Sequence, residues 1–287
     1  MTRFLIAKGI AKSPPLLSLD TSVKLGLLHV INVTQEEAKQ LTESYTGTSP
    51  TDPVVSTLMS EYRDVFFGLG KHKHIKAKLT VDESIQPVAH RQRRIPYNLA
   101  KKAAHEELRL REQGVIETVP NKQPTTWCTN PVIAPFVNLF RHESTTHCNS
   151  APVTKALTVE DIKFKLEGAT VFSLLDMNEG YYQLELDESS RHMTTFYGTE
   201  CKMRYIRLNY VTISEQDIFD KAMDDTVSGL QGELYMRNDF IVFGRDNTEH
   251  DTALENLLQR FRECGLTFNP KKCKFRLPQI EFFGFVF

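Results

Sequence analysis

The sequence predicts an α+β fold in which antiparallel strands carry the functional residues and helices pack against them. Three segments lead to this prediction. Residues 170–175 read as an apolar strand, residues 234–244 as two apolar runs around a polar tip, and residues 250–264 repeat apolar residues at helical spacing. The tip at Arg237 and Asn238 is typical of a tight β-turn, because asparagine tolerates the left-handed conformation that such turns need. We therefore expect a β-hairpin followed by a helix that ends at Gly265.

The size and composition are those of a globular protein. The chain has 287 residues, 40% of them hydrophobic, which suits one large domain or two small ones. Its five cysteines form no Cys-x-x-Cys pair, which argues against a zinc site or a disulfide framework and favours a reducing compartment. No apolar run reaches the ~18 residues of a membrane span. We expect a soluble intracellular protein, cytoplasmic or nuclear, with no membrane partner.

A local excess of positive charge underlies the formal net charge of −1. Residues 71–111 contain eleven Lys and Arg against four Asp and Glu, an excess of seven. This excess suits contact with a nucleic-acid backbone, and it is also typical of a solvated basic face. The candidate nucleic-acid-binding residues within it are Arg91, Arg93, Arg94, Lys101 and Lys102.

The first part of the chain is predicted to be a separate piece. Residues 1–50 hold a short amphipathic segment, and residues 47–53 are rich in Gly, Ser, Thr and Pro, as linkers are. From residue 54 the pattern changes. Residues 58–66 predict a short helix, and the alternation over residues 75–81 predicts a half-buried strand. Residues 100–113 predict a helix whose buried face includes Ala104 and Leu108 and which Gly114 ends.

The second half alternates strands and helices. Thr158 and Asp161 have the spacing of a capping box at the start of a short helix that Gly168 ends. The strand at residues 170–175 follows, and residues 182–186 alternate like a further strand. Residues 218–224 predict an amphipathic helix that runs on to Gly229.

Two carboxylates stand where predicted strands end. Asp176 closes the apolar strand, and Asp239 follows the tip of the hairpin. Strand-end carboxylates that converge can hold a hard cation such as Mg²⁺, which takes oxygen ligands. A hairpin tip considered alone is also typical of an ordinary surface turn.

At these residues the sequence resembles the reverse transcriptase of gypsy-type LTR retrotransposons. The family carries one aspartate on a strand before a Gly-Tyr-Tyr-Gln-like run, here Asp176 and residues 180–183, and two more on a Tyr-X-Asp-Asp hairpin, here residues 236–239. Residues 93–97 and 130–135 also match the family's fingers closely, and residues 269–275 and 280–285 resemble the end of its palm.

The resemblance implies a right-hand polymerase with fingers and an antiparallel palm sheet that has helices on one face, over residues 54–287, with the thumb missing. It implies RNA-directed DNA synthesis with two Mg²⁺ ions at Asp176 and Asp239, an RNA or DNA template-primer and dNTPs. Tyr181 falls at the position where the family keeps an aromatic residue to exclude a ribose 2′-hydroxyl, and plain packing explains a tyrosine there equally well. Residues 1–50 would be a remnant of the region between protease and polymerase.

The sequence departs from the family at three places in the site. Asn238 replaces the first hairpin aspartate, Thr146 falls where the family has its triphosphate-binding arginine, and Tyr210 lies in an Asn-Tyr-Val run where the family has Pro-Phe-Gly. Loss of one carboxylate weakens Mg²⁺ binding, and no threonine replaces a bidentate arginine. We therefore expect a degenerate, catalytically impaired polymerase. The alternative is a non-catalytic nucleic-acid-binding protein, or a decayed or co-opted transposon fragment.

Overall fold

The computed structural model describes residues 52–80, 86–120, 123–133, 140–142, 159–209, 215–236, 239–282 and 285–287. By its internal contacts the chain divides into Met1–Thr46 and Gly47–Phe287, and every described residue belongs to the second unit. The predicted remnant at residues 1–50, the capping residue Thr158, and the positions Thr146, Tyr210 and Asn238 lie outside the described residues.

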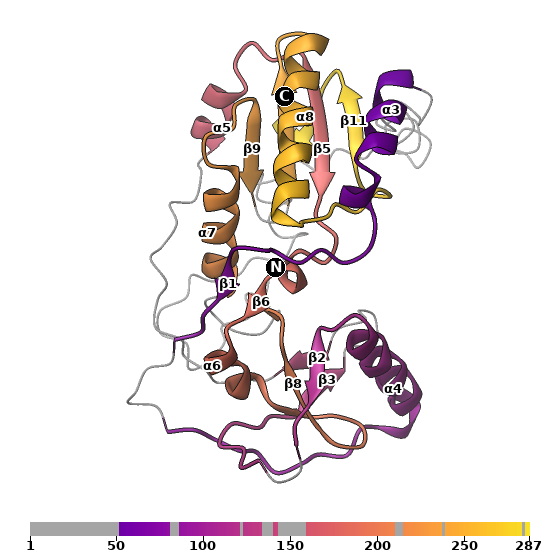
Figure 1. Cartoon of the computed structure of the whole chain (residues 1–287), viewed down its shortest axis with the longest axis vertical. Helices are drawn as coiled ribbons and strands as arrows, with labels where there is room; N and C mark the ends of the chain where they lie inside the picture. Colours follow the sequence, from indigo (N-terminus) through magenta and orange to yellow (C-terminus); the bar gives the residue numbers. More distant parts are fainter. Residues whose placement is uncertain are drawn as a thin grey trace, which may run out of the picture. The chain divides into compact units, whose positions relative to one another are not determined.

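The central element is a four-stranded antiparallel sheet in the order β11-β5-β10-β9 (Figure 1). The two middle strands are the ones predicted to carry carboxylates. β9 and β10 pair as a hairpin in which Asp239 is opposite Met236, which leaves a two-residue connection, as the sequence predicted. The strands are β5 (Val171–Asp176), β9 (Glu233–Met236), β10 (Asp239–Gly244) and β11 (Lys274–Leu277).

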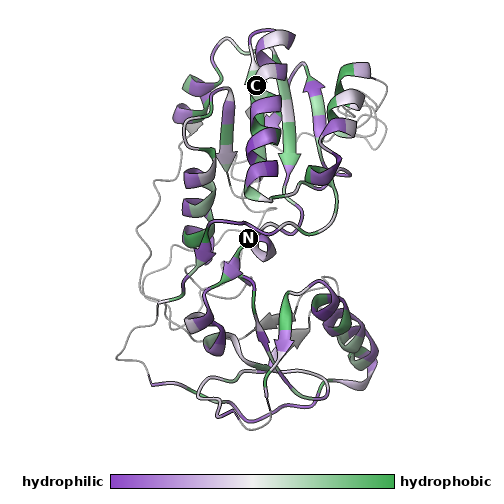
Figure 2. Cartoon of the chain, in the orientation of Figure 1, coloured by the Kyte–Doolittle hydropathy of each residue, from purple (hydrophilic) through white to green (hydrophobic). Residues whose placement is uncertain are grey.

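Apolar side chains fix this sheet on both faces. Helix α8 (Asn247–Cys264) packs on one face through Leu254, Leu257 and Phe261, as its periodicity predicted, and ends at Gly265 with a φ of 76°. Figure 2 shows its outer side as mainly hydrophilic and the strands behind it as hydrophobic. A smaller cluster, which includes Ile241 of β10, packs separately from this core. Because Phe240, Ile241 and Val242 are all fully buried, β10 is enclosed on both sides and its register is strongly specified.

The remaining strands form smaller sheets. β2, β8 and β7 form an antiparallel sheet, β3 pairs with β4, β12 pairs with β13, and β1 pairs in parallel with β6. The helices are α3 (Pro53–Glu61), η1 (Arg63–Phe66), α4 (Tyr97–Glu112), α5 (Val159–Lys165), η2 (Gly180–Gln183), α6 (Glu188–Arg191), η3 (His192–Thr194) and α7 (Glu215–Val227). The strands are β1 (Lys76–Ala77), β2 (Ile116–Thr118), β3 (Pro131–Ile133), β4 (Phe140–His142), β6 (Glu185–Leu186), β7 (Phe196–Tyr197), β8 (Lys202–Tyr205), β12 (Glu281–Phe282) and β13 (Phe285–Val286). None of the helices found among the described residues combines the length and the apolar character needed to cross a membrane.

Two local predictions were wrong. Helix α4 turns a different face to the core from the one expected, because Ala103, Glu106 and Leu110 are buried while Leu108 is 52% exposed. Residues 182–183, predicted as part of an alternating strand, belong to the 3-10 helix η2. The alternation was misleading because Tyr182 and Gln183 are both buried, the glutamine by hydrogen bonds instead of by strand pairing.

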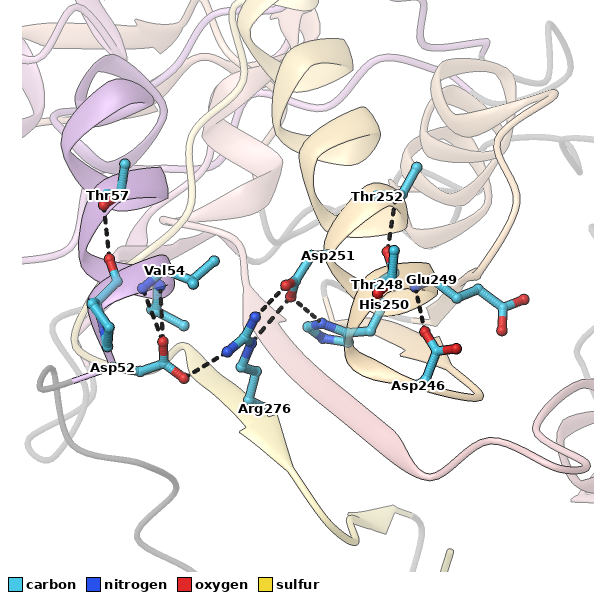
Figure 3. A network of polar contacts seen from close by, with 12 residues as sticks. Asp52, Val54, Thr57, Asp246, Thr248, Glu249, His250, Asp251, Thr252 and Arg276 are labelled. Carbon is cyan, nitrogen blue, oxygen red and sulfur yellow. Dashed lines mark hydrogen bonds and ion pairs between the residues drawn. The ribbon is translucent and has the colours of Figure 1, made fainter.

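A partly buried polar network joins the start of the described chain to the central sheet (Figure 3). The guanidinium of Arg276 on β11 lies between the carboxylates of Asp52 and Asp251 and forms ion pairs with both. Asp52 also caps α3, since its Oδ1 accepts the Val54 N–H at 2.9 Å. Asp251 lies 3.0 Å from His250 Nδ1, and His250 Nε2 lies 2.8 Å from the hydroxyl of Ser173 on β5. One arginine thus links α3, β11 and α8.

Arg276 reaches this position through an unusual backbone. Its φ of 50° lies in the left-handed region that favours glycine, and the pairing of β11 with β5 shifts register between Lys274 and Leu277. The shift lets the Arg276 N–H donate to Ser173 Oγ at 3.1 Å. Two ion pairs and this hydrogen bond offset the backbone strain, which is of order 1–3 kcal/mol for such a residue.

His72 is buried in a site that accepts only its neutral form. The ring is 3% exposed, and its Nε2 lies 3.0 Å from Thr226 Oγ1. Its Nδ1 accepts the N–H groups of His74 and Ile75 at 3.2 and 3.0 Å. Burial, with a smaller contribution from His74, lowers the pKa of His72 to about 4. A proton on Nδ1 would break both backbone hydrogen bonds.

The lowered pKa of His72 predicts acid sensitivity. Because the unfolded chain binds the proton at its ordinary pKa of 6.5, His72 contributes stability above that pH and loses it as the pH falls toward 4. In His72→Asn the amide oxygen still accepts the two backbone N–H groups. From pH 7.5 to pH 4 the wild type should lose about 3 kcal/mol more of its unfolding free energy than His72→Asn loses. Urea denaturation measures it, with exposed His105→Asn on α4 as the control; a pH-independent difference would contradict this assignment.

Candidate functional site

Asp176 and Asp239 are brought together by strand pairing. Asp176 is the last residue of β5, Asp239 is the first residue of β10, and the two are direct partners in the antiparallel register. Burial raises the pKa of the Asp239 carboxyl, and the charge of Asp176 raises it further. A carboxylate whose charge is disfavoured by both burial and a like neighbour is one that a cation would stabilise.

A lysine from the turn that precedes β11 contacts Asp176 of this pair. The Asn269 N–H donates to the Asp176 carbonyl at 2.8 Å, and the Asn269 carbonyl accepts the N–H groups of Lys272 and Cys273 at 3.0 and 3.2 Å. The turn so formed places Lys272 Nζ 3.0 Å from Asp176 Oδ1 and 3.1 Å from its Oδ2. The lysine lowers the pKa of Asp239, against the effects of burial and of Asp176.

The loop after Asp176 is anchored by a buried glutamine. Gln183 is fully buried, and its Nε2 donates to the carbonyls of Asn178 and Thr267 at 2.7 and 2.8 Å. Its Oε1 accepts the Thr267 N–H at 2.8 Å. The one amide group thus bonds to the loop after Asp176 and to the segment around Thr267. The sequence analysis did not assign Gln183 a role; its place at the end of the Gly-Tyr-Tyr-Gln run was the available signal.

A second anchor on this loop comes from helix α4. Glu179 has a φ of 48°, a left-handed conformation that non-glycine residues seldom adopt, and its carboxylate pairs with Arg109 at 3.0 Å. Arg109 also pairs with Glu106 at 2.7 Å. The sequence analysis missed this contact, because nothing in the local pattern links residues 70 positions apart.

Tyr181 is part of the core. The side chain is 6% exposed, its hydroxyl donates to Gln216 Oε1, and its ring lies 4.8 Å from that of Phe219 between centroids. This environment gives the tyrosine a packing role. The neighbouring departure from the family, Asn209, is 1% exposed, and its Oδ1 has no hydrogen-bond partner within the described ranges.

The five predicted nucleic-acid-binding residues are exposed. Asn130 holds the segment that carries three of them, since its Oδ1 accepts the Arg93 N–H at 2.7 Å and its Nδ2 donates to the Arg91 carbonyl at 3.0 Å. The exposed residues are Arg91, Arg93 and Arg94, which precede α4, and Lys101 and Lys102, which lie on it.

The described part of the chain contains no group of three or more His, Cys, Asp and Glu side chains placed to hold a metal ion. The carboxylate pair is therefore the oxygen donor set that the structure offers. Its chemistry fits a hard divalent cation, because such ions take carboxylate oxygens as ligands, and a cation would offset both the burial and the like charge of Asp176 that raise the pKa of Asp239.

The fold is that of a reverse transcriptase. A foamy virus protease–reverse transcriptase solved with double-stranded DNA matches with a TM-score of 0.69 at 17% identity, over 90% of this chain and 47% of that one. The foamy virus protein solved with an RNA/DNA hybrid matches with a TM-score of 0.70 at 17% identity, over 90% of this chain and 36% of that one. The α+β fold class of palm and fingers that the sequence predicted is thereby confirmed.

The relatives in sequence are retrotransposon proteins. The Pol polyproteins of the Drosophila melanogaster transposons 412 and gypsy are 33% and 26% identical over 129 and 121 residues, which are 44% and 41% of this chain. An uncharacterized protein of Caenorhabditis elegans is 30% identical over 238 residues, or 80% of this chain. The chain spans 10–18% of the length of these relatives. No family model matches the sequence. The chain therefore carries a reverse-transcriptase-like region related to retrotransposon Pol polyproteins.

The raised pKa of Asp239 predicts that removing its charge stabilises the fold. Because its pKa is raised, the folded state is penalised above that pKa, and the penalty is lost as the pH falls through the ordinary value of 3.8, below which the carboxyl is protonated in both states. Asp239→Asn should raise the unfolding free energy by roughly 1 kcal/mol at pH 7.5 in EDTA, as removal of functional-site charge often does. Urea titrations at pH 7.5 and at about pH 3, below the ordinary carboxyl pKa, test this, with the exposed Asp225→Asn as the control. A gain that persists in full at the lower pH would have another cause.

Proposed function

We propose that this chain is the fingers and palm, over residues 54–287, of a retrotransposon Pol polyprotein, and that its ancestral reaction is RNA-directed DNA synthesis. The observation that carries the proposal is the placement of Asp176 directly opposite Asp239 at the strand ends of a reverse transcriptase fold. The foamy virus proteins with this fold were solved with double-stranded DNA and with an RNA/DNA hybrid. The proposed partners are accordingly an RNA or DNA template-primer and dNTPs.

The proposed metal ligands are Asp176 and Asp239. Two Mg²⁺ ions, when bound, would activate a primer 3′-hydroxyl and neutralise a triphosphate. The carboxylates would supply oxygen ligands, and the antiparallel register of β5 and β10 would hold them at a fixed separation. Gln183 and Arg109 would keep the loop after Asp176 in place, because each bonds to it from outside the sheet.

We propose that the reaction is impaired in this chain. Asn238 offers an amide oxygen where the family has a carboxylate, so one negative charge is missing beside Asp239. Loss of a single electrostatic contact of this kind lowers rates by about 10²–10³. Thr146 and Tyr210, at the family's nucleotide-binding positions, would weaken dNTP binding further.

The second candidate function is nucleic-acid binding without catalysis. A contrast between the basic residues and the catalytic positions favours it. The five basic residues Arg91, Arg93, Arg94, Lys101 and Lys102 are exposed, while Asn238 and Thr146 depart from the family's catalytic pattern. A decayed or co-opted transposon fragment would keep the first property and lose the second.

Reversal of the hairpin substitution separates these two functions. Asn238→Asp should raise the affinity for Mg²⁺, because hard-cation binding increases with ligand charge. Primer extension should rise from near background by roughly tenfold or more but stay below a full recovery of 10²–10³, since the nucleotide pocket remains incomplete. The measurement is extension of a labelled primer with Mg²⁺ or Mn²⁺, with Asn238→Asp combined with Thr146→Arg as the further step. Wild-type protein that already extends primers as fast as both variants would contradict the proposed impairment.

The basic residues should control binding through charge. Arg94→Gln with Lys102→Gln should weaken binding to an RNA/DNA hybrid at 50 mM salt, and the slope of log K against log salt should fall by about 0.9 for each phosphate that the protein no longer neutralises. Fluorescence anisotropy across a salt series measures both quantities. Lys274→Gln, an exposed lysine on β11, is the control. An unchanged slope would identify the residues as a solvated face.

A further inference from the structure

Lys272 is held against the carboxylate pair by the backbone around it. The antiparallel bridge between Met177 and Phe268 and the hydrogen bond from Asn269 to the Asp176 carbonyl, at 2.8 Å, fasten the turn to the end of β5. Within the turn, the Lys272 N–H donates to the Asn269 carbonyl at 3.0 Å. The ammonium therefore starts from a fixed point next to Asp176, although its side chain is 62% exposed.

The ammonium contacts the same oxygens that a metal would use. Lys272 Nζ lies 3.0 Å from Oδ1 and 3.1 Å from Oδ2 of Asp176. A divalent ion held by either oxygen would lie at about 2.0–2.6 Å from it. A lysine ammonium and a divalent ion at such distances from one carboxylate lie within a few ångströms of each other, and their like charges repel.

We infer that Lys272 is a tethered counter-cation of the Asp176–Asp239 pair, which a divalent ion must displace, so that this lysine sets the metal affinity of the site. This inference rests on the proposed metal-binding function of the two aspartates. It assigns the lysine two effects. Without metal it neutralises part of the repulsion between the carboxylates, and with metal it lowers the occupancy at a given ion concentration.

The displacement is physically accessible. An exposed lysine–carboxylate pair contributes little to stability, because both groups are well hydrated when apart. The four-carbon stem lets the ammonium move away while the turn stays in place. The lysine thus weakens metal binding without blocking it.

The experiment compares Lys272→Met with wild type and with Lys271→Met. Lys271 is exposed and adjacent in the same turn, and the matched substitution removes the same charge and shape. Chelator-treated proteins are titrated with Mn²⁺, without nucleic acid, and free Mn²⁺ is followed by electron paramagnetic resonance. Lys272→Met should bind Mn²⁺ with a Kd lower by on the order of tenfold, because a repulsive charge has been removed next to the ion. Lys271→Met and Lys272→Arg should bind like wild type.

A second readout tests the metal-free role. In EDTA, Lys272→Met should lower the melting temperature slightly, and the same substitution in an Asp176→Asn background should lower it less, because the carboxylate that the lysine contacts is gone and only the charge of Asp239 remains. Far-UV circular dichroism checks that each variant is folded.

The outcomes separate the inference about Lys272 from the proposed metal-binding role of the two aspartates. Saturable Mn²⁺ binding with the same Kd in wild type and Lys272→Met would overturn the inference and leave the proposed metal site standing. Binding that is absent from both proteins, or that Asp176→Asn does not reduce, would overturn the metal role of the proposed function and the inference with it. A shift of equal size in Lys271→Met would reduce the effect to general surface charge and overturn the inference alone.

Discussion

The antiparallel register between β5 and β10 is the constraint on which the candidate site depends. Asp176 and Asp239 are opposite each other only in that register, and a slip of one residue would turn Asp239 to the other face of the sheet. The slip is opposed by apolar burial, because Phe240, Ile241 and Val242 are all fully buried behind Asp239. Burial of the strand thus holds two like charges face to face, an arrangement that their own interaction opposes.

Buried polar contacts then fix the segments around the sheet. Gln183 bonds to the loop after Asp176 and to the backbone of Thr267, so the two chain segments that flank the carboxylates are held by one amide. Along β5, where its N–H bonds to Ser173, Arg276 joins β11 to α8 and to Asp52. Each of these groups would be costly to bury without its partners. The surroundings of the site are therefore specified by directional bonds as well as by the apolar core.

The sequence predicted the parts of the fold that follow from periodicity. The hairpin, the strand that ends at Asp176 and helix α8 are all present, since apolar spacing and the turn residues determined each of them. The face of α4 was mispredicted because two of its buried positions are glutamates, of which Glu106 pairs with Arg109 and Glu107 accepts the Thr199 N–H at 2.7 Å. A carboxylate that is buried by a distant partner looks like a surface residue in the sequence. The same limit hid the contacts of Glu179 and Lys272.

The balance of charge at the site connects Asn238 with Lys272. Two ionised carboxylates carry −2, and the ammonium bonded to one of them adds +1, so the described groups sum to −1. With the family's first hairpin aspartate in place of Asn238 the sum would be −2, which would still favour a divalent ion after the lysine had paired. In this chain the substitution at residue 238 and the lysine both reduce the same quantity, the negative charge available to a metal. Because hard-cation affinity depends on ligand charge, the loss of one aspartate has a larger effect here than it would have in a site without the lysine.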